Sequence, residues 1–63
     1  MKFQIKRSKD KQFYFVLIAR NGETLLTSET YKRKASCTSA IKSLKKGIVG
    51  ASVFDLTTTK VLK

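Results

Sequence analysis

A chain of 63 residues with 14 Lys and Arg against four Asp and Glu carries a formal net charge of +10. Its length predicts one domain over residues 1–63 with a marginal core, because a domain of about 60 residues buries only about 60% of its unfolded surface. Cys37 is its only cysteine and it has no histidine, so an intrachain disulfide and a Cys/His metal site are excluded, which leaves packing and self-association to support the core.

The first two predicted strands form a hairpin. Phe3 and Ile5 alternate with Gln4 over residues 3–5, and because strand side chains alternate between faces, both apolar residues face the core. A polar turn over residues 7–11 follows. Residues 13–19 are the longest apolar run and are rich in aromatic and β-branched residues, which predicts a second strand antiparallel to the first.

The second strand is apolar on both faces. Phe13, Phe15, Leu17 and Ala19 point one way, and we call the opposite set, Tyr14, Val16 and Ile18, the far face. One helix covers only one face of a sheet, and apolar side chains left in water invite association. We therefore hypothesise that the far face packs on another protein surface, most simply a second copy. The alternative is an ordinary exposed patch partly covered by Lys stems.

The third strand follows a turn. Asn21-Gly22 between two β-prone runs predicts a type I′ hairpin, in which both residues take positive φ. The turn places residues 23–28 antiparallel to the second strand, which completes a three-stranded meander with the apolar strand at its centre.

A helix and a last strand complete the chain. Cys37, Ile41, Leu44 and Ile48 fall at spacings of four, three and four, which predicts a helix from about residue 32 to 46 with Gly47 near its C-cap. Residues 52–57 predict a fourth strand with Phe54 and Leu56 on one face. The tail, residues 58–63, either extends this strand or frays. The fold class is therefore α+β.

Spaced motifs accompany this order of elements: Phe13-x-Phe15-x-Leu17-x-Ala19-x-Asn21-Gly22-Glu23, Ser28-Glu29-x-Tyr31, Lys34-Ala35-x-Cys37, Ile41-x-Ser43-x-Lys45-Lys46 and Val53-x-Asp55-Leu56. Over roughly residues 3–57 their combination resembles the YegP-like family of small bacterial and archaeal proteins of uncharacterised function.

The resemblance implies a β3-α-β unit that pairs, as tandem repeats or as two chains, into one sheet with exchanged C-terminal strands. This chain holds one unit, so it resembles the two-chain version, and Phe54 and Leu56 join the far face as candidate interface residues. The resemblance implies no activity, cofactor or catalytic residue. The chain departs from the family at the far face, which is mostly polar in typical members, and at Lys32-Arg33, where the family usually has Thr-Ser.

The predicted helix start is strongly basic. Lys32, Arg33 and Lys34 lie where cations are unfavourable and where no Ser, Thr, Asp or Asn cap is present. Free N–H groups and cations together suit a phosphate group, and Lys6 and Arg7 of the first hairpin are further candidate anion contacts. The alternative is that Thr30 caps the helix or that solvent screens the charges.

The positive charge favours an acidic partner such as nucleic acid. The alternative is that the lysine-rich surface only keeps a small protein soluble. Eleven of the basic residues are Lys and three are Arg. Because Arg is the better bidentate reader of bases, diffuse phosphate attraction is favoured over sequence-specific readout. The lone cysteine and the lack of a signal peptide or long apolar segment favour a cytoplasmic protein that neither enters a membrane nor binds a metal.

The residues do not favour catalysis. No histidine is present, the four acids are scattered, and Cys37 lies on the apolar helix stripe, where a structural thiol is expected. We therefore predict a non-catalytic interaction module without a cofactor that forms a homodimer through its sheet. The alternative is a basic accessory protein that binds nucleic acid through phosphate contacts.

Overall fold

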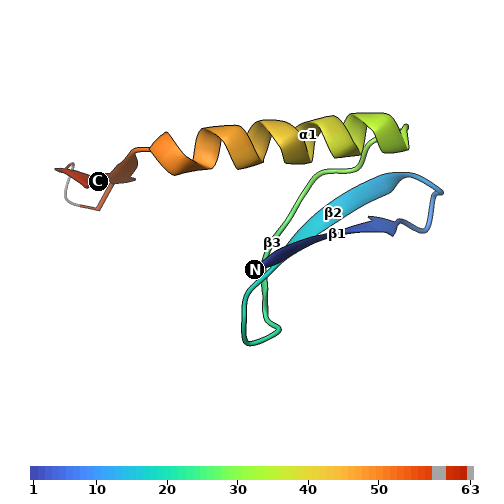
Figure 1. Ribbon diagram of the computed structural model, residues 1–63, viewed down its shortest axis with the longest axis horizontal. Coiled ribbons are helices and arrows are strands. Elements are labelled where there is room, and N and C mark those ends of the chain that lie inside the picture. The colour runs from blue at the N-terminus through green and yellow to red at the C-terminus, as the bar shows by residue number, and fades with distance from the viewer. Residues whose placement is uncertain (58–59, 63) are drawn as a thin grey trace.

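The computed structural model describes residues 1–57 and 60–62. Three strands, one helix and a C-terminal strand follow one another in the predicted α+β order, which is thereby confirmed (Figure 1). The elements are β1 (Lys2–Arg7), β2 (Phe13–Ile18), β3 (Thr24–Thr27), α1 (Lys34–Gly47), the 3-10 turn η1 (Ile48–Gly50), β4 (Val53–Asp55) and β5 (Lys60–Leu62).

The first three strands form an antiparallel meander in the order β1-β2-β3, with β2 in the centre. Ile5 pairs with Phe15 and Phe3 with Leu17, so these four side chains share one face. The rings of Phe3 and Phe15 meet edge to face, with centroids 5.8 Å apart. The register of the hairpin thus builds an aromatic core beneath the helix.

The β2–β3 turn lies at Asn21-Gly22 as predicted, but the predicted turn type is wrong. Ala19 accepts a hydrogen bond from the Gly22 N–H at 3.0 Å and donates its own N–H to the Glu23 carbonyl at 2.8 Å. Gly22 has φ +88°, whereas Asn21 does not take positive φ. This is a type I turn followed by a left-handed glycine, the usual three-residue hairpin loop.

The helix begins two residues later than predicted and ends later as well. Tyr31 exchanges backbone hydrogen bonds of 2.7 and 2.6 Å with Phe13, which holds the chain extended up to that point. Arg33 is then the N-cap residue, without a capping side chain, so Thr30 does not cap this helix. At the other end Gly47 is helical and Ile48 continues in the right-handed region, so Gly47 is not a C-cap glycine.

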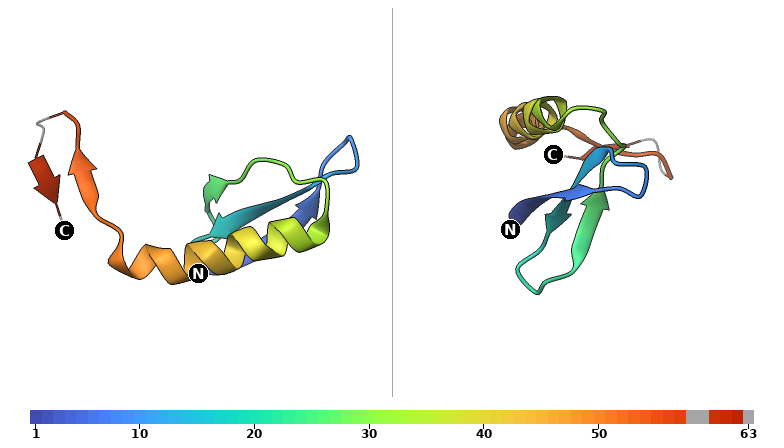
Figure 2. Two further views of the ribbon diagram at one scale, coloured as in Figure 1. Left: turned by 90° about the horizontal axis from the view of Figure 1, so that it is seen from above. Right: turned by 90° about the vertical axis from the view of Figure 1, so that its right-hand side faces the viewer.

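The helix covers one face of the meander, as the end-on view in Figure 2 shows. Phe15, Leu17 and the fully buried Cys37 form the centre of the core between α1 and β2. The core is small, in keeping with a chain of this size.

The side chains of the far face are less exposed than the sequence predicted. Val16 and Ile18 are only 4% and 8% exposed in the single chain, so the expectation that one copy leaves them in water is wrong. Their register partners explain the burial: Gln4 and Thr27 flank Val16, and Lys2 and Thr24 flank Ile18. Side chains at paired positions lie about 5 Å apart, close enough to cover a small β-branched neighbour.

Beyond the sheet the chain continues as a C-terminal arm, which we define as residues 48–57. Figures 1 and 2 show α1 extending past the meander and β4 standing beyond the end of the helix, away from β1, β2 and β3. The radius of gyration is 14.0 Å, against about 11 Å for a compact chain of this length. The backbone of residues 60–62 pairs antiparallel with β4, so this part of the tail neither extends that strand nor frays. Residues 58, 59 and 63 lie outside the described residues.

Candidate interaction surfaces

The C-terminal arm carries exposed apolar side chains. Phe54 and Leu56, both candidate interface residues from the sequence, are 62% and 84% exposed. Ile48, Val49 and Val53 of the same arm are also exposed. Several large apolar side chains exposed within one short segment favour association. Of the predicted interface residues, Phe54 and Leu56 in the arm remain accessible, while Val16 and Ile18 are buried and Tyr14 is half-buried.

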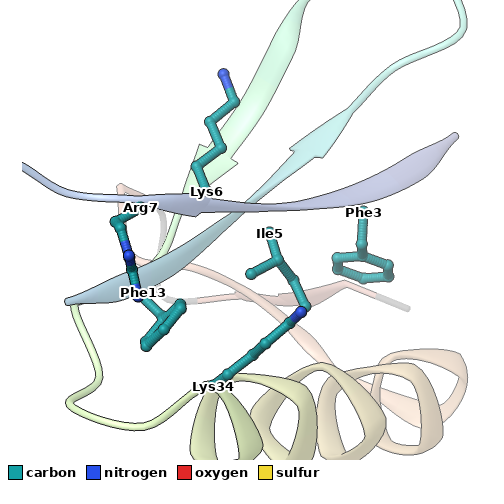
Figure 3. A pocket seen from close by; sticks show the side chains of 6 residues that line it. All are labelled: Phe3, Ile5, Lys6, Arg7, Phe13 and Lys34. Atoms are coloured by element: carbon teal, nitrogen blue, oxygen red, sulfur yellow. The ribbon is translucent and has the colours of Figure 1, made fainter. Parts of the chain in front are cut away.

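A second surface is an open groove between β1 and the first turn of α1. Its volume is about 410 Å³, and it is lined by Phe3, Ile5, Phe13, Lys6, Arg7 and Lys34. Figure 3 shows Phe3, Ile5 and Phe13 facing the space between β1 and α1, with the Lys34 side chain reaching across it from the helix. Lys6 points to the other side of the strand. The groove therefore has an apolar floor and a cationic rim.

The strand that forms one wall of the groove has an open edge. β1 is the outermost strand of the meander, and among the described residues no strand pairs with its outer side. Such an edge presents unpaired N–H and C=O groups, which makes it a template for another strand. The guanidinium of Arg7 lies 4.9 Å from the centroid of the Phe13 ring, a cation–π contact that fixes this end of the rim.

The predicted anion contacts lie at one end of the molecule. Figure 1 shows the β1–β2 connection and the start of α1 side by side, and the Phe13–Tyr31 backbone pair holds them there. The basic end comprises seven exposed cations, Lys6, Arg7, Lys9, Lys11, Lys32, Arg33 and Lys34.

Little on the protein neutralises the basic end. Asp10 is the only acid within residues 6–11 or 32–34. Its carboxylate accepts a 2.5 Å hydrogen bond from the Ser8 hydroxyl. The first turn of α1 contains no acid, and no side chain caps it, so its N–H groups are open to an external acceptor. The helix dipole and the cations act in the same direction, toward binding an anion.

Comparison with known proteins assigns the chain to a family. The family model described as "Domain of unknown function (DUF1508)" matches residues 8–55. The chain belongs to this YegP-like family. It is 47% identical to UPF0339 protein Atu0232 of Agrobacterium fabrum over 90% of this chain and 92% of that protein. It is 54% identical to UPF0339 protein YegP of Escherichia coli O157:H7 over 68% of this chain and 39% of that protein. No solved structure matches it.

The relatives of the YegP-like family differ in how much of them this chain spans. It covers half of UPF0339 protein PA0329 of Pseudomonas aeruginosa, at 46% identity, but nearly all of Atu0232. The names of these relatives state no activity. Family membership therefore confirms the resemblance that the sequence motifs indicated. A function has to be proposed from the exposed surfaces of the protein.

The sequence patterns did not predict the groove, although one of its walls is partly visible in the alternation of residues along β1. Phe3, Ile5 and Arg7 alternate along β1, which already indicates an apolar stripe ending in a cation. The position of α1 above that stripe depends on the late helix start after Tyr31, which no local pattern indicated.

Cys37 has the properties of a core residue. Its side chain is fully buried, and loss of solvation raises the pKa of the thiol above its ordinary value of 9.0. We expect iodoacetamide at about pH 8 to label Cys37 only through unfolding, whereas an exposed thiol from Ser36→Cys on the same helix reacts at once. Mass spectrometry with and without urea measures both. Equal labelling of Cys37 in native and urea-unfolded protein would contradict this expectation.

The raised pKa also fixes the direction of a pH effect. The unfolded thiol ionises first as pH rises, so the contribution of Cys37 to the free energy of unfolding is complete below about pH 9 and is lost above it.

Among residues 1–57 and 60–62, no group of three or more His, Cys, Asp or Glu is placed to hold a metal ion. No helix in this described part is long and apolar enough to cross a membrane.

Proposed function

We propose that this member of the YegP-like family is a non-catalytic interaction module that works as a homodimer, with each copy placing its C-terminal arm against the other. The observation that supports this most directly is that β4 stands away from the β1-β2-β3 meander, with Phe54 and Leu56 exposed. Fully burying a side chain of this size contributes about 1.5–3 kcal/mol. In a two-fold dimer each contact occurs twice, which doubles the gain. The proposed setting is the cytoplasm, where a lone thiol stays reduced.

The far face has a smaller part in this proposal than the sequence indicated. Because Val16 and Ile18 are already buried in one chain, a second copy gains little by covering them. Tyr14 is half-buried and remains available at the edge of a contact. The dimer therefore depends on the arm.

Light scattering after gel filtration tests the dimer. The chain has a mass of 7.1 kDa, and we expect twice that mass at micromolar concentration. Because both copies carry +10, the dimer tightens as salt screens their repulsion, up to about 0.5 M. A single-chain mass at every salt and protein concentration would rule the dimer out.

A second candidate function is binding of nucleic acid by the basic end through phosphate contacts. It is supported by the gathering of seven exposed cations from two separate segments at one end. Cations paired with phosphates release counterions, so the binding constant falls as salt rises. The predominance of Lys over Arg favours contacts with the backbone rather than with base edges.

A matched pair of variants tests this second function. Replacing Lys32, Arg33 and Lys34 by Ala removes three charges at the basic end, and replacing Lys42, Lys45 and Lys46 by Ala removes three from the opposite half of α1. We expect anisotropy titrations with labelled DNA and RNA to show about tenfold or greater loss of affinity for the first variant and a much smaller loss for the second. An equal loss in both would show diffuse attraction without a site.

A further inference from the structure

We propose that the groove between β1 and α1 binds a small amphipathic carboxylate, a molecule of the class of the medium-chain fatty acids. The apolar body of the ligand lies on the groove floor, and its carboxylate meets Arg7 and Lys34. All the residues of this site belong to one chain. The inference therefore goes beyond the proposed dimer and does not depend on it.

The position of α1 leaves the groove open. The helix packs mainly on β2, the central strand, where Phe15, Leu17 and Cys37 are buried. β1 lies at the edge of the sheet, to one side of this contact. Apolar residues on the α1 side of β1 are therefore only partly covered: Ile5 is 39% exposed and Phe3 is half-buried. Apolar surface that remains open in a concave place favours an apolar ligand.

The floor suits an apolar chain in size and in composition. Its volume of about 410 Å³ lies in the range of about 300–1,000 Å³ that is usual for small-molecule sites with apolar and aromatic walls. Phe3, Ile5 and Arg7 occupy every second position of β1 and so face one side. From Phe3 to Arg7 the strand runs about 13 Å, which is close to the length of an extended decanoate ion.

Arg7 closes one end of this floor with hydrogen-bond donors. Its guanidinium lies 4.9 Å from the centroid of the Phe13 ring, and this cation–π contact holds it beside the apolar floor. A guanidinium can donate two parallel N–H bonds to one carboxylate. The Lys34 side chain reaches across the groove from the helix, as Figure 3 shows. Its stem can cover the apolar body of the ligand while its ammonium group meets the carboxylate.

The charges around the groove select an acidic head group. Of the described residues that line the groove, three are basic and none is acidic. A neutral alcohol of the same length gains the same apolar contacts but no charge-assisted hydrogen bond, and an ammonium head group is repelled. Because the floor between Phe3 and Arg7 is apolar, a ligand with one acidic group at one end fits better than a polyanion.

NMR titration of the whole chain with decanoate, below the concentration at which decanoate forms micelles, tests the site. We expect a dissociation constant of about 0.1–1 mM for so small a ligand in an open groove. The largest shifts are expected at the Ile5 methyl groups and at the rings of Phe3 and Phe13. Largest shifts at Phe54 of the C-terminal arm, or no binding at millimolar concentration, would overturn the inference.

A series of ligands separates the two halves of the site. We expect each methylene added from hexanoate to octanoate to decanoate to strengthen binding about two- to fourfold. Octanoate is expected to bind about tenfold or more tightly than octanol, and octylammonium is expected to bind more weakly than either. Equal affinities along the series would refute the apolar floor, and equal affinities of octanoate and octanol would refute the cationic rim.

A matched pair of double variants tests the rim directly. Arg7→Gln with Lys34→Gln removes two cations from the groove. Lys9→Gln with Lys32→Gln removes two exposed cations of the same basic end that do not line it. We expect the first variant to bind decanoate about tenfold or more weakly and the second to stay within about twofold of the native chain. Circular dichroism checks that both fold. Equal losses would show that diffuse charge holds decanoate, which would overturn the inference.

Discussion

Phe15→Ala is expected to remove most of the stability of this protein. Phe15 is buried at the centre of the meander and its ring meets that of Phe3 edge to face. Truncating a buried Phe costs about 3–5 kcal/mol, because contacts are lost and a cavity remains. The whole chain has only about 3–9 kcal/mol available, at about 0.05–0.15 kcal/mol per residue.

Urea denaturation followed by circular dichroism measures this loss. Leu25→Ala is the control, because Leu25 is an exposed apolar residue of the same sheet, and a surface substitution changes the free energy of unfolding by about 0.5 kcal/mol or less. Similar midpoints for Phe15→Ala and Leu25→Ala would show that the core does not lie beneath α1.

The double variant Phe54→Lys with Leu56→Lys is expected to be monomeric at every concentration at which the native chain is a dimer. Both side chains are exposed in the single chain, so the change leaves the meander and α1 intact and acts on association alone. It removes the apolar contacts of both arms and adds repulsion between two strongly positive copies. Together these effects weaken the dimer by about a hundredfold or more.

The control adds the same charge elsewhere. Thr24→Lys with Leu25→Lys places two lysines at exposed positions of β3. Light scattering compares the two double variants, with circular dichroism to check helix content. If both are equally dissociated, charge alone governs association and the arm is not the contact.

The elements that the sequence predicted well depend on local patterns. The apolar run from Phe13 and the stripe through Cys37 and Leu44 each need only their own periodicity. The late helix start could not be predicted in this way, because the Phe13–Tyr31 backbone pair joins residues far apart in the chain. The same pair brings the β1–β2 connection to the start of α1. The clustering of cations from these two segments at the basic end therefore also depends on tertiary structure.

The far face illustrates the same limit for burial. An apolar pattern on both sides of a strand shows that both sides need cover, but not what supplies it. Val16 is buried, and Gln4 and Thr27 stand at the positions paired with it, a register that was not known beforehand. The position of β4 away from the meander could not be predicted either, because the direction in which a chain leaves a helix is not encoded in hydrophobic periodicity.

The length of α1 sets the distance between the meander and the C-terminal arm. The 14 residues of α1 span about 21 Å, and β4 follows at the far end of the helix (Figure 1). Inserting or deleting a single residue in α1 would turn the arm by about 100° around the helix axis, whereas a change of seven residues would move the arm by about 10.5 Å and nearly restore its direction. The direction in which Phe54 is presented therefore depends on the number of helical residues as well as on the sequence of the arm itself.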